Sequence, residues 1–273
     1  MAWLCYDGIR VVGVSESYGV RIMKEFWIGL LGLSCLLVTD FLQADAKPIR
    51  KLSYDENAPV VDLLGDGAKG KLGVRVIPQN EFRSRILIEN QTAGPLTVRL
   101  PKAVAAVHVV PKDDPEPNSR VRATEEADES DETAGTGQAV VGTFGPMNAD
   151  ANGFPHESEE GSAFTIPAGR RVQILLHSAC AEHGKRPPIS RMTYQLKPLA
   201  QQTANEALQK VVQAYDPLAT DPLAFQAAIW HLASGLSWET LAQKTVKKGG
   251  QTVPYFTRRQ LALAQNLVAS AEE

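Results

Sequence analysis

A helix that is apolar around most of its circumference constrains this chain more than any other feature, because such a helix has to be packed against other parts of the protein. Asp221 can accept hydrogen bonds from the free backbone N–H groups of the first turn, and Pro222 suits the first helical position, where its missing N–H costs nothing. Gly235 is a typical residue just past a helix end. The sequence therefore predicts a buried helix between Asp221 and Gly235.

One polar side chain interrupts the apolar surface of this helix. Phe225 and Ile229 recur at helical spacing on one stripe, and Gln226 and Trp230 recur on the adjacent stripe. A buried amide needs hydrogen-bond partners. The simplest interpretation is that Gln226 bonds to a backbone group and that Trp230 belongs to the core.

The N-terminal region predicts export. An apolar run over residues 26–38 follows basic residues, and Ala44-Asp45-Ala46 matches the small-x-small pattern before a signal-peptidase cut. We expect residues 1–46 to be a signal peptide, with the residues before Met23 as an overextended start or a long n-region. The apolar run is well short of the roughly 20 residues that cross a bilayer, so we expect no transmembrane span after cleavage and a secreted or cell-envelope location.

Cleavage would leave Cys180 as the one cysteine of the mature chain, because Cys5 and Cys35 lie in the predicted signal peptide. A single thiol in an exported protein cannot form an internal disulfide. It is a buried inert thiol, an intermolecular partner, a metal ligand or a group held in another bond, and the sequence leaves these alternatives open. The net charge of -3 indicates no particular partner.

The middle of the chain predicts an antiparallel sheet. After an extended lead-in over residues 47–70, short runs in which apolar and polar residues alternate are separated by turn residues across residues 71–197. This pattern is typical of an immunoglobulin-like antiparallel β-sandwich, so we expect an α+β protein that begins with such a sandwich. The expected strands cover residues 72–77, 82–90, 96–100, 104–110, 164–166, 170–176 and 192–196.

An acidic segment interrupts the expected sandwich at residues 112–162. Its Asp and Glu residues far outnumber Lys and Arg, and it holds too little apolar surface to offset the entropy of ordering. We expect a disordered insertion, with a short strand at residues 140–144 inside it. The carboxylates also suit calcium, but the segment lacks the spacing of a calcium loop.

Residues 198–273 predict a small helical subdomain. Ser237 starts a short helix after the buried one, and this helix is expected to fray at residues 247–250. Thr257 and Gln260 form a capping box at the start of the last helix. We expect these helices to pack beside the sheet.

Residues 225–230, Phe-Gln-Ala-Ala-Ile-Trp, resemble the Gln-x-Ala-Ile-Trp motif of the Cys-Gln thioester domains of bacterial surface adhesins. In that family a cysteine of the strand region is joined to a helix-borne glutamine by an internal thioester, which captures an amine on a host or matrix surface. The resemblance implies that Cys180 is the thiol partner and that Gln226 is the acyl partner. It also implies a shell of apolar side chains that keeps water from the bond, made of Phe225, Ile229 and Trp230.

A metal site is a second interpretation. His177, Cys180 and His183 offer two imidazoles and a thiol, which suit zinc or copper, and His231 is a candidate fourth ligand. In an extended segment, however, residues three apart lie on opposite faces of the strand. The spacing also matches no standard zinc pattern.

A helix-turn-helix over residues 233–242, with basic residues nearby, is a third interpretation. It applies if the protein stays in the cytoplasm, and export argues against a nucleic-acid partner. We therefore expect an exported surface or envelope protein with a binding or adhesion role, not an enzyme, that needs no cofactor. Its expected partner is a surface protein or a glycan.

Overall fold

The computed structural model describes residues 47–109, 137–146 and 153–273, so the predicted signal peptide at residues 1–46 lies outside the described ranges. No helix in these ranges is both long enough and apolar enough to cross a membrane. The strands are β1 (Val60–Asp62), β2 (Leu72–Asn80), β3 (Arg83–Asn90), β4 (Leu96–Leu100), β5 (Val104–His108), β6 (Val140–Gly145), β7 (His156–Ser158), β8 (Gly161–Ile166), β9 (Arg171–Cys180), β10 (Tyr194–Pro198), β11 (Thr245–Lys248) and β12 (Gln251–Pro254). The helices are the short 3-10 helix η1 (Asp66–Ala68), α1 (Leu199–Gln202), α2 (Glu206–Gln213), α3 (Pro222–Ser234), α4 (Trp238–Gln243) and α5 (Arg258–Glu272).

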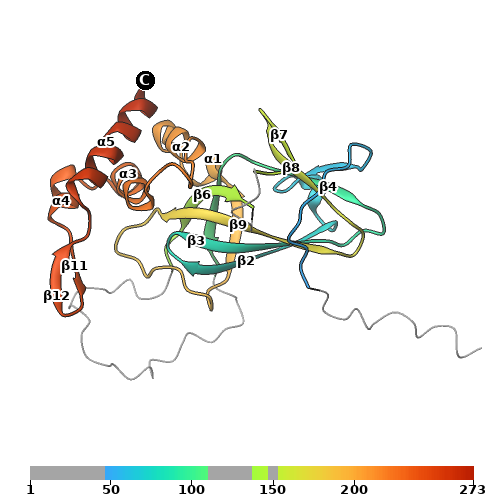
Figure 1. Cartoon of the computed structure of the whole chain (residues 1–273), viewed down its shortest axis with the longest axis horizontal. Coiled ribbons are helices and arrows are strands. Elements are labelled where there is room, and N and C mark those ends of the chain that lie inside the picture. Colours follow the sequence, from blue (N-terminus) through green and yellow to red (C-terminus); the bar gives the residue numbers. More distant parts are fainter. Residues whose placement is uncertain (1–46, 110–136, 147–152) are drawn as a thin grey trace, which may run out of the picture. The chain divides into compact units, whose positions relative to one another are not determined.

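A closed barrel forms the centre of the protein, with the strand order β10-β2-β3-β9-β6-β5 (Figure 1). Every neighbouring pair in it is antiparallel. β10 closes the barrel, because it pairs with β5 along its whole length and meets β2 where Tyr194 lies opposite Val76.

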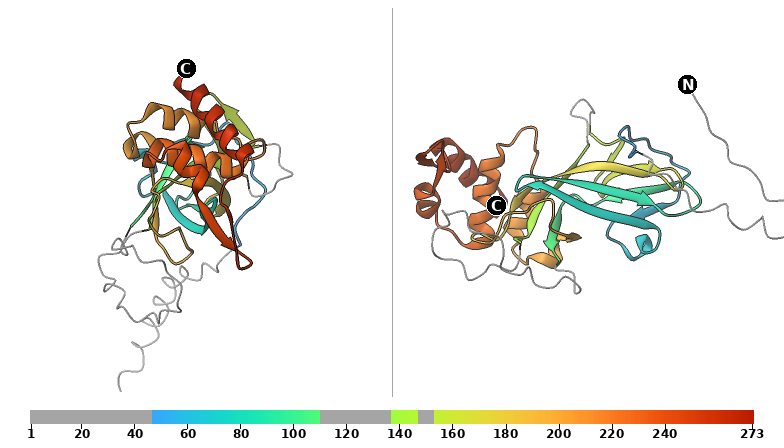
Figure 2. Two further views of the ribbon diagram at one scale, coloured as in Figure 1. Left: turned by 90° about the vertical axis from the view of Figure 1, so that its left-hand side faces the viewer. Right: turned by 90° about the horizontal axis from the view of Figure 1, so that it is seen from below.

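A smaller sheet with the order β1-β4-β8-β7 extends the strand part of the protein. Its β1 and β4 run parallel, and its other pairs are antiparallel. Figure 2 shows this sheet and the helices at opposite ends of the long barrel strands. The barrel is therefore the element to which both other parts attach.

The expected immunoglobulin-like β-sandwich is wrong, because the main sheet closes on itself. A sandwich would leave β2 and β5 as edges of separate sheets, whereas β10 hydrogen-bonds to both of them. β6 fills the place between β5 and β9. β10 thus joins the two strands that would otherwise end the sheet, through one residue pair on the β2 side. The expected helical part at the C-terminal end is confirmed.

Part of the acidic segment contributes to this closure. The short strand expected at residues 140–144 is present as β6, a member of the barrel, and β7 also falls inside the range 112–162. Residues 110–136 and 147–152 of the expected insertion lie outside the described part of the chain.

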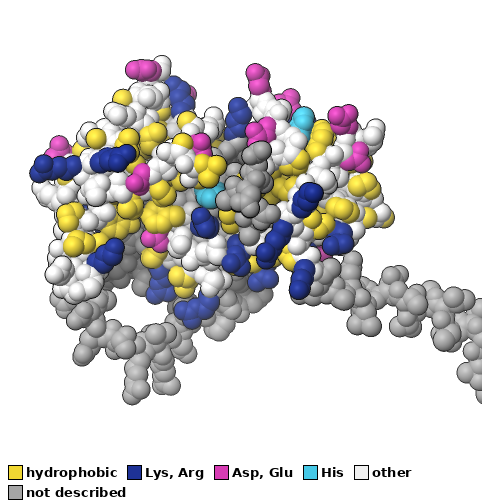
Figure 3. All heavy atoms as spheres, in the orientation of Figure 1, with side chains coloured by type: hydrophobic (Ala, Val, Ile, Leu, Met, Phe, Trp, Pro, Cys, Tyr) yellow, Lys and Arg dark blue, Asp and Glu magenta, His cyan; other side chains and the backbone are white. Residues whose placement is uncertain are grey.

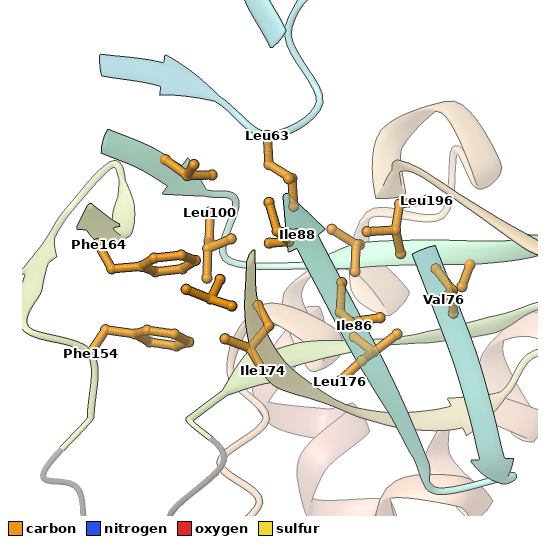
Figure 4. Packing of buried hydrophobic residues seen from close by; sticks show 14 of the residues in the cluster. Leu63, Val76, Ile86, Ile88, Leu100, Phe154, Phe164, Ile174, Leu176 and Leu196 are labelled. Atoms are coloured by element: carbon orange, nitrogen blue, oxygen red, sulfur yellow. The ribbon is translucent and has the colours of Figure 1, made fainter. Parts of the chain in front are cut away.

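Two apolar cores lie back to back across β9. Ile174 and Leu176 point into the barrel, where they join a cluster that also includes Phe164 of the smaller sheet (Figure 4). Ala179 belongs instead to a second cluster, in which the outer face of the barrel packs against the helices. Val141 of β6 contributes to the same outer cluster. The alternation of side chains along β9 thus divides its residues between two cores.

The ends of the helices agree with their local sequence. The Asp221 carboxylate accepts hydrogen bonds from the first-turn N–H groups of α3, and Gly235 adopts the left-handed conformation at its C-terminus, with φ of 68°. Thr257 and Gln260 form the expected capping box of α5. In place of the fraying expected at residues 247–250, however, β11 and β12 form a hairpin.

We expect Gly142→Ala to destabilise the fold by roughly 1–3 kcal/mol or more, since overpacking a tight site costs about that much. The added Cβ would collide with the backbone oxygen of His177 on the neighbouring strand. Urea unfolding measures the effect. Gly94→Ala is the matched control, because a Cβ at that turn position meets nothing within 4 Å.

Candidate functional site

The buried amide of Gln226 is paired with the main chain of Cys180. The Gln226 Oε1 atom accepts a hydrogen bond from the Cys180 N–H at 2.9 Å, and its Nε2 donates to the Cys180 carbonyl oxygen at 2.8 Å. Gln226 is fully buried. The structure therefore brings together the two residues that the resemblance singled out.

The position of Gln226 follows from the end of β3. Arg83, the first residue of β3, pairs with His177, and the Ser178 N–H still donates to the carbonyl of the preceding Phe82. Beyond that point the chain belongs to the turn between β2 and β3, and within the described ranges no strand lies beside this edge of β9. The Gln226 amide occupies this edge and forms the two hydrogen bonds that a neighbouring peptide group would form.

The thiol of Cys180 faces the other way, into the barrel. Cys180 is 1% exposed and belongs to the barrel core together with Val140, whereas Gln226 contacts its main-chain atoms. Burial raises the pKa of the thiol, and the negative charge of Glu81 adds to the rise. Cys180 is the one free cysteine among the described residues.

All three side chains expected to shield a thioester are buried, but on different sides of α3. Trp230 lies one helical turn after Gln226 and packs near Phe256, at 5.8 Å between ring centroids. Phe225 stacks on Tyr215 at 3.7 Å, and Ile229 is fully buried in the helical core. The Gln226 amide is therefore shielded from water, and Trp230 lies on the same helical stripe as this amide.

Ser234 forms a second set of hydrogen bonds between α3 and the segment after β9. The Ser234 hydroxyl donates to the Ala181 carbonyl at 3.0 Å, and the His183 N–H donates to the Ser234 oxygen at 3.0 Å. Together with Gln226, these contacts hold α3 along β9 and its extension. The contact between α3 and β9, called the seam below, is thus fixed at one end by Gln226 and at the other by Ser234.

Lys244 and Tyr255 lie beside Trp230. Together with His183, these side chains form a wall at one end of the contact between α3 and β9. The Lys244 Nζ lies 5.3 Å from the Trp230 ring centroid and 5.6 Å from that of Tyr255, which are cation–π distances. The same Nζ is 3.0 Å from His183 Nε2. Within the described part of the chain, the buried Trp230 indole nitrogen has no hydrogen-bond partner. This wall places an ammonium group and an imidazole next to the seam.

The electrostatics of this wall favour neutral groups. Burial lowers the pKa of His183, and the neighbouring Lys244 charge lowers it further. Burial also lowers the pKa of Lys244 and raises that of Tyr255 to about 12. Both effects favour the neutral form of the His183 imidazole over its charged form.

The sequence interpretation missed Lys244 and Tyr255 as site residues because it missed the hairpin that joins them. The Tyr255 N–H donates to the Lys244 carbonyl at 2.8 Å, at the open end of β11 and β12. The available signal was the Gly249-Gly250 pair, since both glycines have positive φ and such pairs are typical of two-residue hairpin turns.

The residues of the expected metal site are separated. His177 and Cys180 lie on opposite faces of β9, and the His177 ring lies against Gly145. His183 stands edge-on to Trp230 at 4.8 Å. Among the described residues, no group of three His, Cys, Asp or Glu side chains is arranged to hold a metal ion.

The residues expected for a helix-turn-helix form the end of α3, a turn and α4, which has six residues. Leu241 of α4 is buried in the helical core, and Trp238 stacks on His231 at 4.1 Å. Lys248 and Arg258 are exposed on β11 and at the start of α5, respectively. The basic side chains therefore extend from the hairpin to α5.

We expect Gln226→Met to lower the free energy of unfolding by roughly 3 kcal/mol, because it leaves a buried N–H and C=O of Cys180 without partners and each costs about 1–3 kcal/mol. Urea unfolding tests this. Gln265→Met, at an exposed position of α5, is the matched control, and its effect should stay within about 0.5 kcal/mol. Equal effects of the two variants would contradict a structural role for the amide.

We also expect Lys244→Met to raise the pKa of His183 toward its ordinary value, because it removes a neighbouring positive charge. The imidazole then titrates at a higher pH than in the unmodified protein. NMR titration of the ring protons measures the shift. Lys248→Met, on the exposed hairpin strand, should leave the His183 titration unchanged.

Comparison with known proteins does not place this chain in a family. No family model, no curated protein and no solved structure matches it. The contact between β9 and α3 is therefore the feature on which a proposed function rests.

Proposed function

We propose that the protein is an exported surface or envelope binding protein, not an enzyme, that captures an amine-bearing partner through a thioester between Cys180 and Gln226. One observation supports this most directly: the carboxamide of Gln226 is held against the main chain of Cys180 by hydrogen bonds of 2.9 and 2.8 Å. The Cys180 Sγ is two bonds from the Cα whose N–H and C=O hold that carboxamide. The carboxamide is thus held at the Cys180 main chain before any bond forms, and the Sγ has to turn out of the barrel core to reach it.

The proposed chemistry needs no further reactant. The Cys180 Sγ attacks the Gln226 Cδ, the Sγ–Cδ bond forms, and the Cδ–Nε2 bond breaks as ammonia leaves with the thiol proton. In the capture step, a primary amine of the partner attacks Cδ, the sulfur leaves, and it takes a proton from the amine. The product is an amide that links the partner to residue 226.

The surroundings suit a bond that water would otherwise hydrolyse. Gln226 is fully buried, and Trp230 is 7% exposed on the same helical stripe. His183 stands edge-on to Trp230 at 4.8 Å, so its imidazole lies beside the same buried side chains.

We expect mature protein purified after export to have a mass that is short of its sequence by one ammonia, and no thiol that reacts in denaturant. Treatment with methylamine should add the mass of one methylamine and release one titratable thiol. Intact-mass spectrometry with a thiol count measures both. The Cys180→Ala variant is the control, with full sequence mass and no methylamine uptake. Full mass together with one free thiol in the unmodified protein would rule out the thioester.

A further inference from the structure

A cavity of about 410 Å³ opens on the outside of the barrel. Its walls come from the ends of β3, β6 and β9, from the region of β7 and β8, and from the connection between α2 and α3. Neither Cys180 nor Gln226 lines it. Its volume falls within the range of roughly 300–1,000 Å³ that is usual for small-molecule sites.

The aromatic part of the cavity wall is held in place by rings packed behind it. Tyr215 stacks on Phe225 of α3 at 3.7 Å, and Phe154 stacks on Phe164 of the barrel core at 5.9 Å. Flat, fixed aromatic walls suit a flat apolar ligand body. The aromatic lining residues are Phe82, Phe144, Phe154 and Tyr215.

Arg83 and His177 supply hydrogen-bond donors side by side on one wall. They are directly opposite each other on β3 and β9. Among the described residues, the Arg83 guanidinium has no ion pair or hydrogen bond. Burial lowers the pKa of His177, and the nearby Arg83 charge lowers it further. The guanidinium is therefore free to bind an anionic group of a ligand.

The two carboxylates of the cavity are already engaged with the protein. Glu157 accepts a hydrogen bond from the Phe154 N–H at 3.0 Å, and Asp216 accepts one from the Leu218 N–H at 2.8 Å. Both are exposed to solvent, which screens their charge. Lys and Arg side chains gather on the lower part of the face in Figure 3, where Figure 1 shows β2 and β3. This field attracts anions toward Arg83.

We propose that the cavity binds a small aromatic anion, with its ring system between the aromatic walls and a carboxylate or sulfonate on the Arg83 guanidinium. This site is separate from the proposed thioester. It gives the protein a reversible small-molecule function in addition to amine capture.

Anilinonaphthalene sulfonate and its neutral analogue phenylnaphthylamine test the proposal on the full mature chain by fluorescence titration. We expect saturable, one-to-one binding of the sulfonate. Arg83→Gln should weaken sulfonate binding by about tenfold, since a charge-assisted hydrogen bond contributes on that order. The same variant should leave binding of the neutral analogue unchanged. Arg85→Gln, two residues along the same outer face of β3 and not part of the cavity lining, is the matched control and should change neither affinity.

A second variant shows where the probe binds. Ser162 lines the cavity, so Ser162→Phe should fill part of it and abolish binding of both probes while the unfolding transition is retained. Undiminished binding to a folded Ser162→Phe variant would overturn the site, and equal effects of Arg83→Gln on both probes would overturn the role of Arg83. Cys180→Ala should bind both probes normally, so the result does not depend on the thioester.

Discussion

The edge of β9 beyond the end of β3 is the constraint on which the C-terminal half of this structure depends. A strand edge buried under helices leaves main-chain N–H and C=O groups without water, and each needs a partner. Gln226 provides both partners for Cys180 from within a helix. The requirement fixes the rotation of α3 about its axis and its position along β9, and Ser234 holds the far end of the same helix. The helical core can then form against the outer face of the barrel.

Local signals in the sequence predicted the helices, whereas the closure of the sheet depended on contacts between distant residues. Asp221 and Gly235 define the ends of α3 through interactions with their own neighbours, so they could be read directly. Closure of the barrel rests on one pairing between Tyr194 and Val76, more than a hundred positions apart. β6 also lies between stretches of acidic composition, which concealed its place in the sheet. Alternation of apolar residues does not distinguish a closed sheet from an open one.

The sequence predicted only part of the candidate site, again because the rest depends on contacts between residues far apart in the chain. The motif around Gln226, and Cys180 as the one cysteine expected to remain after export, indicated which residues meet, but their mode of contact depends on where the pairing of β3 with β9 stops. The wall formed by Lys244 and Tyr255 required recognition of a hairpin with a glycine pair at its turn. His177 and His183 looked equivalent in the sequence, yet the strand sends one to the outer cavity and the chain beyond it brings the other to Trp230. Spacing along the chain does not contain this information.

The hydrogen bonds of Gln226 also bear on the direction of the proposed reaction. In the thioester the carbonyl oxygen can still accept from the Cys180 N–H, but the lost Nε2 leaves the Cys180 carbonyl without its donor, at a cost of roughly 1–3 kcal/mol. The sulfur must also leave the barrel core, where its absence creates a cavity. Attack by an amine reverses both losses, because the new amide carries an N–H and the thiol returns to the core. In the proposed scheme, the fold therefore stabilises the captured state relative to the thioester.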